Sequence, residues 1–434
     1  MHSSSNGAAE AFASINHKFS KLSKSQTQRC IYKVHKHLRD INSKSYEPEI
    51  IAIGPYHHGK DTLQMMEEHK LRYLQLLLVR KNQNVEQYIS AIGELENLAR
   101  NCYGEPISLS QAKFIEMLVL DGCFIIELIK RCNRKDSHCK DDPIFLRHWI
   151  MNSLQRDLVL FENQIPFIVL CKLFDLIEAP NQHNRLIYLI LFFCQSLYPG
   201  AVHENRTNRD SGEIKHLLDL IHANWRPSFD DHNNDVLVDV DADEFRLKRE
   251  SRFIHSATEL TDANVGFSKR KSNTLSLFDV DFEKGTIVMP PLTIEDRTEC
   301  FFRNLIAYEQ YFPDSRRNFV TEYVRLLDCL INSPRDVEIL SECGIIDNWL
   351  GENEVVASIV NQLTDSVTGA GKHYMYSGMM DRVNEHYGRP YNRAMAVLSR
   401  DYFNSPWAYI TFFSAVFLLL LTVAQTVCSV LQVI

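Results

Sequence analysis

The sequence is poor in the two residues that build tight turns. Its 16 glycines and 14 prolines make up 30 of 434 residues, or about 7%. In average proteins these two types together reach roughly 12%. Architectures made of many short strands and turns are therefore disfavoured. Because 45% of the residues are hydrophobic, the chain can build a large core, which excludes disorder along most of it. We expect a mainly α, multi-helical globular fold.

An excess of positive charge is also absent. Lysine and arginine number 47 against 55 aspartates and glutamates, which gives a net charge of -8. A protein whose whole surface serves nucleic acid carries a positive potential instead. We therefore expect no nucleic-acid partner.

Cysteine motifs are missing, although the chain has 11 cysteines. Their number is odd, they are scattered, and no C-x-x-C pair occurs. The nearest approach to a metal cluster, Cys132, His138 and Cys139, has the spacing of no zinc module. Reduced, buried thiols are the expected state of these residues.

No catalytic motif is intact. Residues 54–61 (GPYHHGKD) nearly match the phosphate-binding loop G-x-x-x-x-G-K-[ST]. However, Asp61 replaces the hydroxyl residue that would hold magnesium, and Pro55 lacks an N–H donor. We favour a structural turn docked by Tyr56. The alternative is a membrane-associated nucleotide- or metal-dependent enzyme that uses this loop.

Two further groups of ligand-type side chains are incomplete. A calcium loop needs glycine at its sixth position, where this chain has Glu244. The histidines in and after the loop 54–61 do not form an H-E-x-x-H pair. The side chains concerned are Asp239, Asp241, Asp243 and Glu250 for calcium, and His57, His58 and His69 with Glu67 and Glu68 for a transition metal. We predict no catalytic residue, no metal site and no cofactor.

The last 29 residues, 406–434, contain no charged side chain. As a helix they would be roughly 43 Å long, more than the ~30 Å hydrocarbon core of a bilayer. Ser405 is a good N-cap, Pro406 suits the first helical position, and Trp407 and Tyr409 suit the membrane interface. The sequence predicts a transmembrane helix over 406–434.

The flanks of this segment predict its orientation. Arg389, Arg393 and Arg400 precede it and no basic residue follows it, so the positive-inside rule places the amino-terminal bulk in the cytosol. The start of the chain lacks the apolar stretch of a signal peptide. We expect a single-pass, tail-anchored protein of the plasma membrane or an endomembrane.

The rest of the chain is read as one helical domain, 25–400, after a flexible N-terminus, 1–24. An acidic linker near 228–250 interrupts it, and residues 275–289 have the pattern of a β-hairpin. Ile50 to Ile53 look strand-like. Apolar residues at helical spacing predict helices over 31–41, 67–79, 85–101, 112–131, 149–161, 166–176, 185–197, 214–224, 299–310, 319–332, 334–343 and 354–364.

Several strings of the sequence resemble one known family. They occur in collinear order and are Ile31-Tyr32-Lys33-Val34, Ile53-Gly54-Pro55-Tyr56-His57-His58-Gly59, Leu120-Asp121-Gly122-Cys123, Glu162-Asn163-Gln164-Ile165-Pro166, Ser256-Ala257-Thr258-Glu259-Leu260, Pro290-Pro291-Leu292-Thr293-Ile294, Phe302-Arg303-Asn304, Gly344-Ile345-Ile346 and Pro406-Trp407. Together they resemble the plant domain of unknown function 247 family, also called uncharacterised protein family 0481. The resemblance covers about residues 29–434.

The resemblance implies a mostly helical plant protein with one C-terminal membrane helix and no known catalytic residues. Certain grass members of the family look like male determinants of self-incompatibility, which implies a non-enzymatic recognition, signalling or scaffold protein with an unknown protein partner. This chain departs from the family pattern at His35, His255, Asn264 and Pro390-Tyr391.

The motif positions also suit architecture. Gly54 and Gly59 suit a loop. Asn163 and Gln164, before Pro166, can cap a helix end. Asp121 and Gly122 within an apolar helix imply close helix packing around a satisfied carboxylate. The positions carried over from the family are Gly54, Pro55, Tyr56, His57, His58, Gly59, Asp121, Gly122, Glu162, Asn163, Gln164 and Pro166.

Overall fold

The fold was analysed in a computed structural model, which describes residues 4–21, 29–134, 142–200, 211–227, 253–270, 276–312, 318–367, 374–390 and 406–433. The chain divides into two compact units. The first comprises Met1–Leu197 and Asn205–Asn224, and the second Tyr198–Glu204 and Trp225–Ile434. The predicted acidic linker near 228–250, the calcium-like residues within it, and His138 with Cys139 lie outside the described residues.

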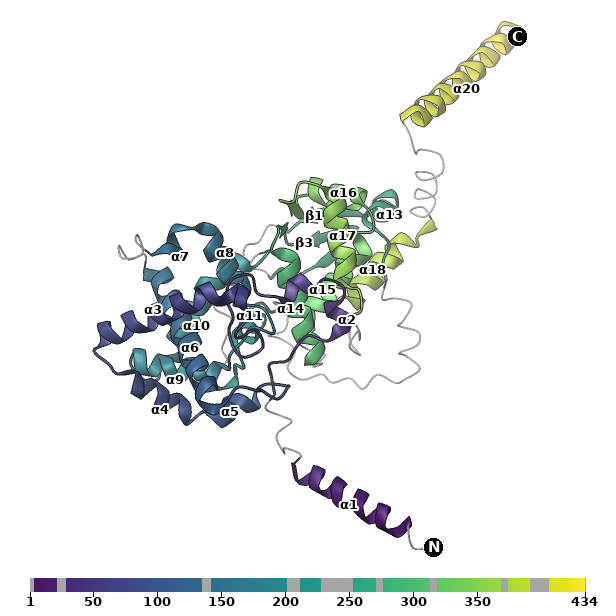
Figure 1. The fold of residues 1–434 in the computed structure, drawn as a ribbon. Helices are drawn as coiled ribbons and strands as arrows, with labels where there is room; N and C mark the ends of the chain where they lie inside the picture. Colours follow the sequence, from purple (N-terminus) through teal and green to yellow (C-terminus); the bar gives the residue numbers. More distant parts are fainter. Residues whose placement is uncertain are drawn as a thin grey trace. The chain divides into compact units, whose positions relative to one another are not determined.

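The regular secondary structure in the described part of unit 1 consists of helices (Figure 1). Its α-helices are α1 (Ser4–Lys21), α2 (Lys36–Arg39), α3 (Gln64–Lys81), α4 (Val85–Gly93), α5 (Glu96–Asn101), α6 (Gln111–Arg134), α7 (Pro143–Leu146), α8 (His148–Asp157), α9 (Phe167–Ile177), α10 (His183–Cys194) and α11 (Leu217–Asn224). Short 3-10 turns are η2 (Ser43–Tyr46), η3 (Asp61–Leu63), η5 (Gln195–Leu197) and η6 (Ser211–Glu213).

Helix α6 is the centre of unit 1. It is apolar nearly all round, so it buries its surface on several sides at once, and it packs against α3, α4, α9 and α10. Gly122 makes the contact with α9 close: a Cβ atom there would lie 2.3 Å from Leu173 Cδ1. The predicted close packing at Asp121-Gly122 is confirmed.

Unit 2 combines helices with short strands. Its helices are α13 (Ala257–Asp262), α14 (Thr298–Tyr311), α15 (Phe319–Leu330), α16 (Pro334–Glu342), α17 (Asn353–Leu363), α18 (Ser377–Tyr387) and α20 (Pro406–Val433). Its strands are β1 (Gly266–Lys269), β2 (Asp281–Glu283), β3 (Thr286–Met289), β4 (Leu292–Ile294) and β5 (Ile346–Asn348). One sheet has the order β1-β3-β2, and β4 pairs with β5 in parallel.

The family strings in unit 2 have structural roles. Ser256 and Glu259 form the capping box that begins α13, and Leu292 pairs with Ile346 in the β4–β5 ladder. Gly344 has φ +70°, and Asn264 has φ +62°. Asparagine tolerates this left-handed conformation, so Asn264 suits the turn that follows α13.

The mainly α fold is confirmed, but the segment 31–41 does not form the predicted helix. Ile31 is in a parallel β-bridge with Tyr103, and the Val34 backbone N–H donates to Glu162 Oε1 at 2.5 Å. Only Lys36–Arg39 is helical. The apolar spacing of the segment reflects the burial of Ile31, Val34 and Leu38. It does not produce a helix, because backbone donors that are bonded to distant residues cannot join one.

Three other boundaries differ from the prediction. The helix expected over 85–101 is two helices that break after Gly93, the residue of lowest helix propensity there. The helix expected to reach Phe161 ends at Asp157. In the hairpin, only Asp281–Glu283 pairs with β3, because Asp279 Oδ2 accepts the Ser276 N–H at 2.8 Å and turns the chain before it. The paired part of the hairpin is confirmed.

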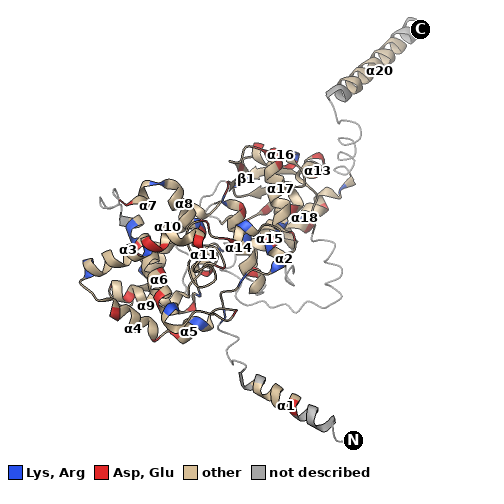
Figure 2. Ribbon diagram, viewed as in Figure 1, with Lys and Arg blue, Asp and Glu red and all other residues tan. Residues whose placement is uncertain are grey.

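Helix α20 begins at Pro406, as predicted. The 18 residues Ile410–Val427 are long and apolar enough to cross a membrane, and none of them is buried inside the protein. In Figure 2 the described part of this helix is tan, the colour of residues other than Lys, Arg, Asp and Glu. Trp407 and Tyr409 lie in the first turns of this helix.

Candidate functional site

Family strings that are far apart in the sequence meet around one extended segment of unit 1, Glu49 to Gly54. The predicted strand at Ile50 to Ile53 is wrong, because no neighbouring strand pairs with it in the described structure. Side chains take the place of a strand. Asp157 accepts backbone N–H bonds from Glu49, Ile50 and Ile51 at 2.8 to 3.1 Å. We call Asp121, Asp157, Asn163 and Gln164, with this segment, the motif cluster.

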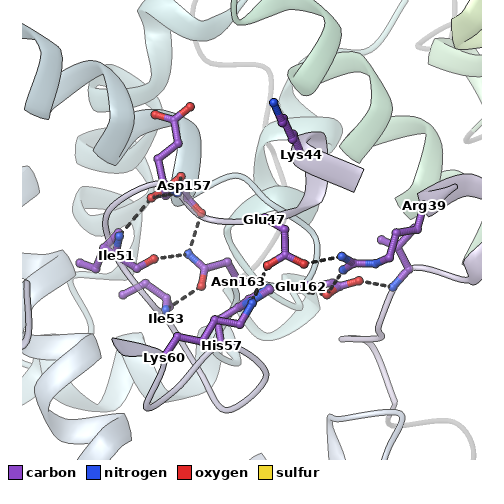
Figure 3. Close-up of polar contacts among 12 residues, drawn as sticks. Arg39, Lys44, Glu47, Ile51, Ile53, His57, Lys60, Asp157, Glu162 and Asn163 are labelled. Carbon is purple, nitrogen blue, oxygen red and sulfur yellow. Dashed lines mark hydrogen bonds and ion pairs between the residues drawn. The ribbon is translucent and has the colours of Figure 1, made fainter. Parts of the chain in front are cut away.

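Asn163 pairs with the segment as a strand would. Its Oδ1 accepts the Ile53 N–H at 2.7 Å, and its Nδ2 donates to the Ile51 carbonyl at 3.1 Å (Figure 3). The same Nδ2 donates to the Asp157 carbonyl at 2.9 Å. One amide therefore satisfies both the extended segment and the last residue of α8.

Gln164 completes the end of α8. Its Nε2 donates to the carbonyls of Leu158 and Leu160, both at 2.8 Å, and its Oε1 accepts the Leu218 N–H at the start of α11. A helix end leaves carbonyls without partners, and these two amides fill that need. The predicted capping role of Asn163 and Gln164 is confirmed at the carboxyl end of α8.

Burial dominates the electrostatics of Asp157. It raises the pKa of this carboxyl to about 6, although the three backbone donors and Arg156 favour the charged form. The Arg156 guanidinium contacts Asp157 Oδ1 at 2.8 Å and also donates to the carbonyls of Lys44 and Glu47. Asp157 and Arg156 thus tie α8 to residues 44–51.

Asp121 satisfies the glycine loop from the opposite side. Its Oδ2 accepts the Gly54 N–H at 2.8 Å, and its Oδ1 lies 2.6 Å from the Nζ of Lys70 on α3. Lys70 is fully buried, and it also donates to the Ala52 carbonyl and to Glu67. Burial raises the pKa of Asp121, with Lys70 opposing this effect. The pair joins α3, α6 and the extended segment.

Gly54 lies where these partners leave no room for a side chain. Its φ is +74°, and a Cβ atom would lie 2.3 Å from the Gln164 carbonyl oxygen. Tyr56 then docks the turn, as predicted: its hydroxyl donates to the Ile31 carbonyl at 3.1 Å and its ring packs edge-on against Tyr103.

A second group of side chains, the charged cluster, lies beside the motif cluster and comprises Arg39, Glu47, His57, Lys60 and Glu162 (Figure 3). Arg39 binds both Glu47 and Glu162, and Lys60 binds Glu47. Two cations thus face two carboxylates. The charges balance within the cluster, so it offers no surplus charge for a ligand.

His57 is enclosed by the charged cluster. Its ring is 2% exposed, with Nδ1 3.5 Å from Glu47 and Nε2 3.5 Å from Glu162. Burial lowers its pKa to about 4, and Lys60 adds to the effect. The ring is therefore neutral at physiological pH. The imidazole thus lies between two carboxylates that are themselves ion-paired.

The remaining motif positions lie in the turn and at the start of α9. Gly59 has φ +78°, and Pro166 is the N-cap of α9. Pro55 and His58 lie half-buried in the turn. Within the described ranges, no group of three or more His, Cys, Asp and Glu side chains is placed to hold a metal ion. The phosphate-loop pattern has its Lys60 bound to Glu47 and its Gly54 N–H bound to Asp121.

Sequence reasoning missed Lys70, Asp157 and Glu47. Lys70 did leave a signal: it interrupts the apolar face of α3 formed by Met66, Tyr73 and Leu77, and a charge on such a face requires a buried partner. Asp157 left none, because it looks like an ordinary polar residue near a helix end.

Comparison with known proteins places the chain in a family. The sequence profile of a family described as a plant protein of unknown function, DUF247, matches residues 31–421. The chain is 31% identical over 419 residues to UPF0481 protein At3g47200 of Arabidopsis thaliana, covering 93% of this chain and 86% of that protein. It is 24% identical over 487 residues to a second UPF0481 protein of that plant, At3g02645, covering 91% and 89%. No solved structure matches the chain significantly. The protein belongs to the DUF247 family of plant proteins of unknown function.

Proposed function

We propose that this protein is a single-pass membrane protein whose helical part binds a protein partner on the cytosolic side, in recognition, signalling or scaffolding rather than in catalysis. The observation that carries this proposal is helix α20. It presents 18 consecutive residues that suit a bilayer and that the rest of the protein does not bury. Exposed leucines and phenylalanines over that length are stable in lipid and costly in water.

The motif residues support a non-enzymatic role. Their polar side-chain atoms hydrogen-bond to backbone groups of the same chain, as seen for Asp121, Asp157, Asn163 and Gln164. Catalytic groups must instead be free to meet a substrate. A rigid, internally satisfied frame is what a binding domain needs to present a fixed surface.

The resemblance of certain grass relatives to male determinants of self-incompatibility supports recognition of a protein partner. The arginines at 389, 393 and 400 precede α20, which supports the cytosolic side for the helical part.

Topology is the test of this proposal. Asn205-Arg206-Thr207 is a glycosylation acceptor pattern upstream of α20, and it lies outside the described residues. In plant cells, we expect the full chain to stay in the membrane fraction, unglycosylated and open to added protease. A glycan at Asn205 that a glycosidase removes, together with resistance of the helical part to added protease, would overturn the proposed orientation. Recovery in the soluble fraction would overturn the anchor.

The enzyme alternative has its own test. We expect no binding of ATP or GTP with magnesium to the wild-type protein by calorimetry, and the same result for Lys60→Ala. Binding by the wild type that Lys60→Ala abolishes would favour the enzyme. Lys113→Ala, on an exposed lysine paired with Glu116, is the matched control.

A further inference from the structure

Two cysteines of unit 1 face each other across a short backbone pairing. The N–H groups of Cys30 and Ile31 donate to the Cys102 carbonyl at 2.8 and 3.0 Å, and the Gly104 N–H donates to the Ile31 carbonyl at 2.8 Å. Ile31 and Tyr103 are partners in a parallel bridge. In a parallel register the preceding residues, Cys30 and Cys102, also stand opposite each other.

The two thiols are in contact. The Cys30 thiol hydrogen-bonds the Cys102 thiol, and both cysteines are free. Neighbouring strands lie about 4.7–4.9 Å apart, inside the range of about 4.4–6.8 Å that the Cα atoms of a disulfide span. The pairing therefore places the two cysteines within reach of a disulfide.

The two sulfurs are chemically unequal. The hydrogen bond from Cys30 lowers the pKa of Cys102, and the same bond together with burial raises the pKa of Cys30. Cys102 is also the more exposed of the two, since Cys30 is 4% exposed. The thiolate is the nucleophile in thiol–disulfide exchange, so Cys102 is the attacking sulfur and Cys30 the resolving one.

We propose that Cys30 and Cys102 form a reversible disulfide when the protein meets a small disulfide oxidant such as oxidised glutathione. The Cys102 thiolate attacks one glutathione sulfur, breaks its S–S bond and releases one glutathione. Cys30 then loses its proton, attacks the Cys102 sulfur of the mixed disulfide and releases the second glutathione. The protein dithiol is oxidised and one glutathione disulfide is reduced to two thiols.

The bond would fasten the segment that begins at Cys30 to the end of α5, which Cys102 follows. The Ile31 carbonyl accepts the Tyr56 hydroxyl, and the Val34 N–H donates to Glu162, so the chain that follows Cys30 already contacts both the glycine turn and the charged cluster. Closing the loop between residues 30 and 102 removes freedom from the unfolded chain. Oxidation would therefore stabilise this arrangement, whichever side of a membrane the unit faces.

Peptide mapping tests the proposal. The full-length chain, purified in detergent, is incubated in oxidised or in reduced glutathione, alkylated and digested with trypsin without reduction. We expect peptides 30–33 and 101–113 to be joined in most of the oxidised sample and separate in the reduced one. Oxidation should also raise the thermal unfolding midpoint by several degrees.

The variants separate this pair from general thiol oxidation. Cys102→Ser removes the more exposed sulfur, so it preserves the buried side of the pairing, and it should lose both the joined peptide and the rise in midpoint. Cys343→Ser, on a partly exposed cysteine of unit 2, should retain both. Three results would overturn the proposal: glutathione that stays on Cys102 without a joined peptide, no oxidation of either cysteine, or a midpoint that oxidation leaves unchanged.

Discussion

Gly54 and Gly59 share a backbone conformation but not an environment. Both have φ values in the left-handed region, +74° and +78°, yet an added Cβ meets the Gln164 carbonyl only at Gly54 and nothing within 4 Å at Gly59. A left-handed non-glycine residue costs roughly 1–2 kcal/mol. Gly59→Ala should cost about that much, and Gly54→Ala should cost about 3 kcal/mol or more because backbone must also move. Denaturant unfolding of both variants measures the difference, and equal losses would contradict the proposed role of Gly54.

His216 is a buried residue whose protonation makes the free energy of unfolding depend on pH. It is fully buried, its Nδ1 accepts the Asp219 N–H at 3.2 Å and its Nε2 lies 3.1 Å from the Cys30 carbonyl. An Nδ1 that accepts a hydrogen bond cannot also carry a proton. Burial lowers the pKa of this ring to about 4, with Asp219 opposing and Lys215 assisting.

The sign of the pH effect follows from that shift. The unfolded chain binds the His216 proton near pH 6.5 and the folded chain only near 4, so this residue's contribution to stability is present above pH 6.5 and is lost as pH falls toward 4. The slope is about 1.4 kcal/mol per pH unit. His216→Gln should lower stability at pH 7 and show a pH dependence that is flatter by that slope. Parallel curves for the wild type and the variant would contradict this account.

At the scale of elements, the Lys70–Asp121 pair joins two helices to the glycine turn. Both side chains are buried, and removing one partner of a buried pair leaves an uncompensated charge at a cost of about 3–5 kcal/mol. Lys70→Met should therefore destabilise unit 1 by that amount. The double variant Lys70→Met with Asp121→Asn should recover part of the loss, because the asparagine side chain is neutral and its oxygen can still accept the Gly54 N–H.

An exposed pair serves as the control for this experiment. Lys113 and Glu116 lie 2.8 Å apart with more than half of each side chain exposed, and Lys113→Met should change the free energy of unfolding by less than about 1 kcal/mol. If the double variant is no more stable than Lys70→Met alone, the pair does not act through charge compensation. Chemical denaturation of the four proteins decides between these outcomes.

The sequence predicts correctly those elements whose backbone hydrogen bonds are local. Helices α3, α6, α9 and α14 to α17 follow from apolar spacing, and Pro334 or Pro166 marks where a helix begins. The extended segments at Ile31 and Ile51 were mispredicted because their backbone partners lie elsewhere: Tyr103 for the first, Asp157 and Asn163 for the second. No local propensity records a hydrogen bond to a side chain more than a hundred residues away.

The candidate site divides in the same way. The glycines of the turn and the amides before Pro166 could be assigned to a loop and to a helix end from their own neighbours. Their convergence on one segment could not, because it depends on how α6 and α8 pack. The Cys30–Cys102 contact is equally invisible in the sequence, where the two residues belong to no recognisable spacing.

At the scale of the whole molecule, helix α20 differs in its chemistry from the other helices that the structure describes. Leu419 and Leu420 lie near its middle and are 66% and 60% exposed. A water-soluble protein seldom leaves so large an apolar surface uncovered. A bilayer would cover this surface completely. A charged residue at the centre of the helix would then carry the free-energy cost of a charge in lipid, without disturbing a contact within the protein.

That difference permits a direct test of the anchor. Arginine at the centre of a membrane helix costs about 3 kcal/mol, whereas leucine contributes a favourable fraction of a kcal/mol, so Leu419→Arg with Leu420→Arg should remove the drive for insertion. We expect alkaline carbonate to leave the wild type in the membrane pellet and to release the double arginine variant. Leu419→Ala with Leu420→Ala, which shortens the same side chains without charge, should stay in the pellet. If the arginine variant also remains there, α20 is held by a contact other than lipid; if carbonate releases the wild type, α20 does not span the bilayer.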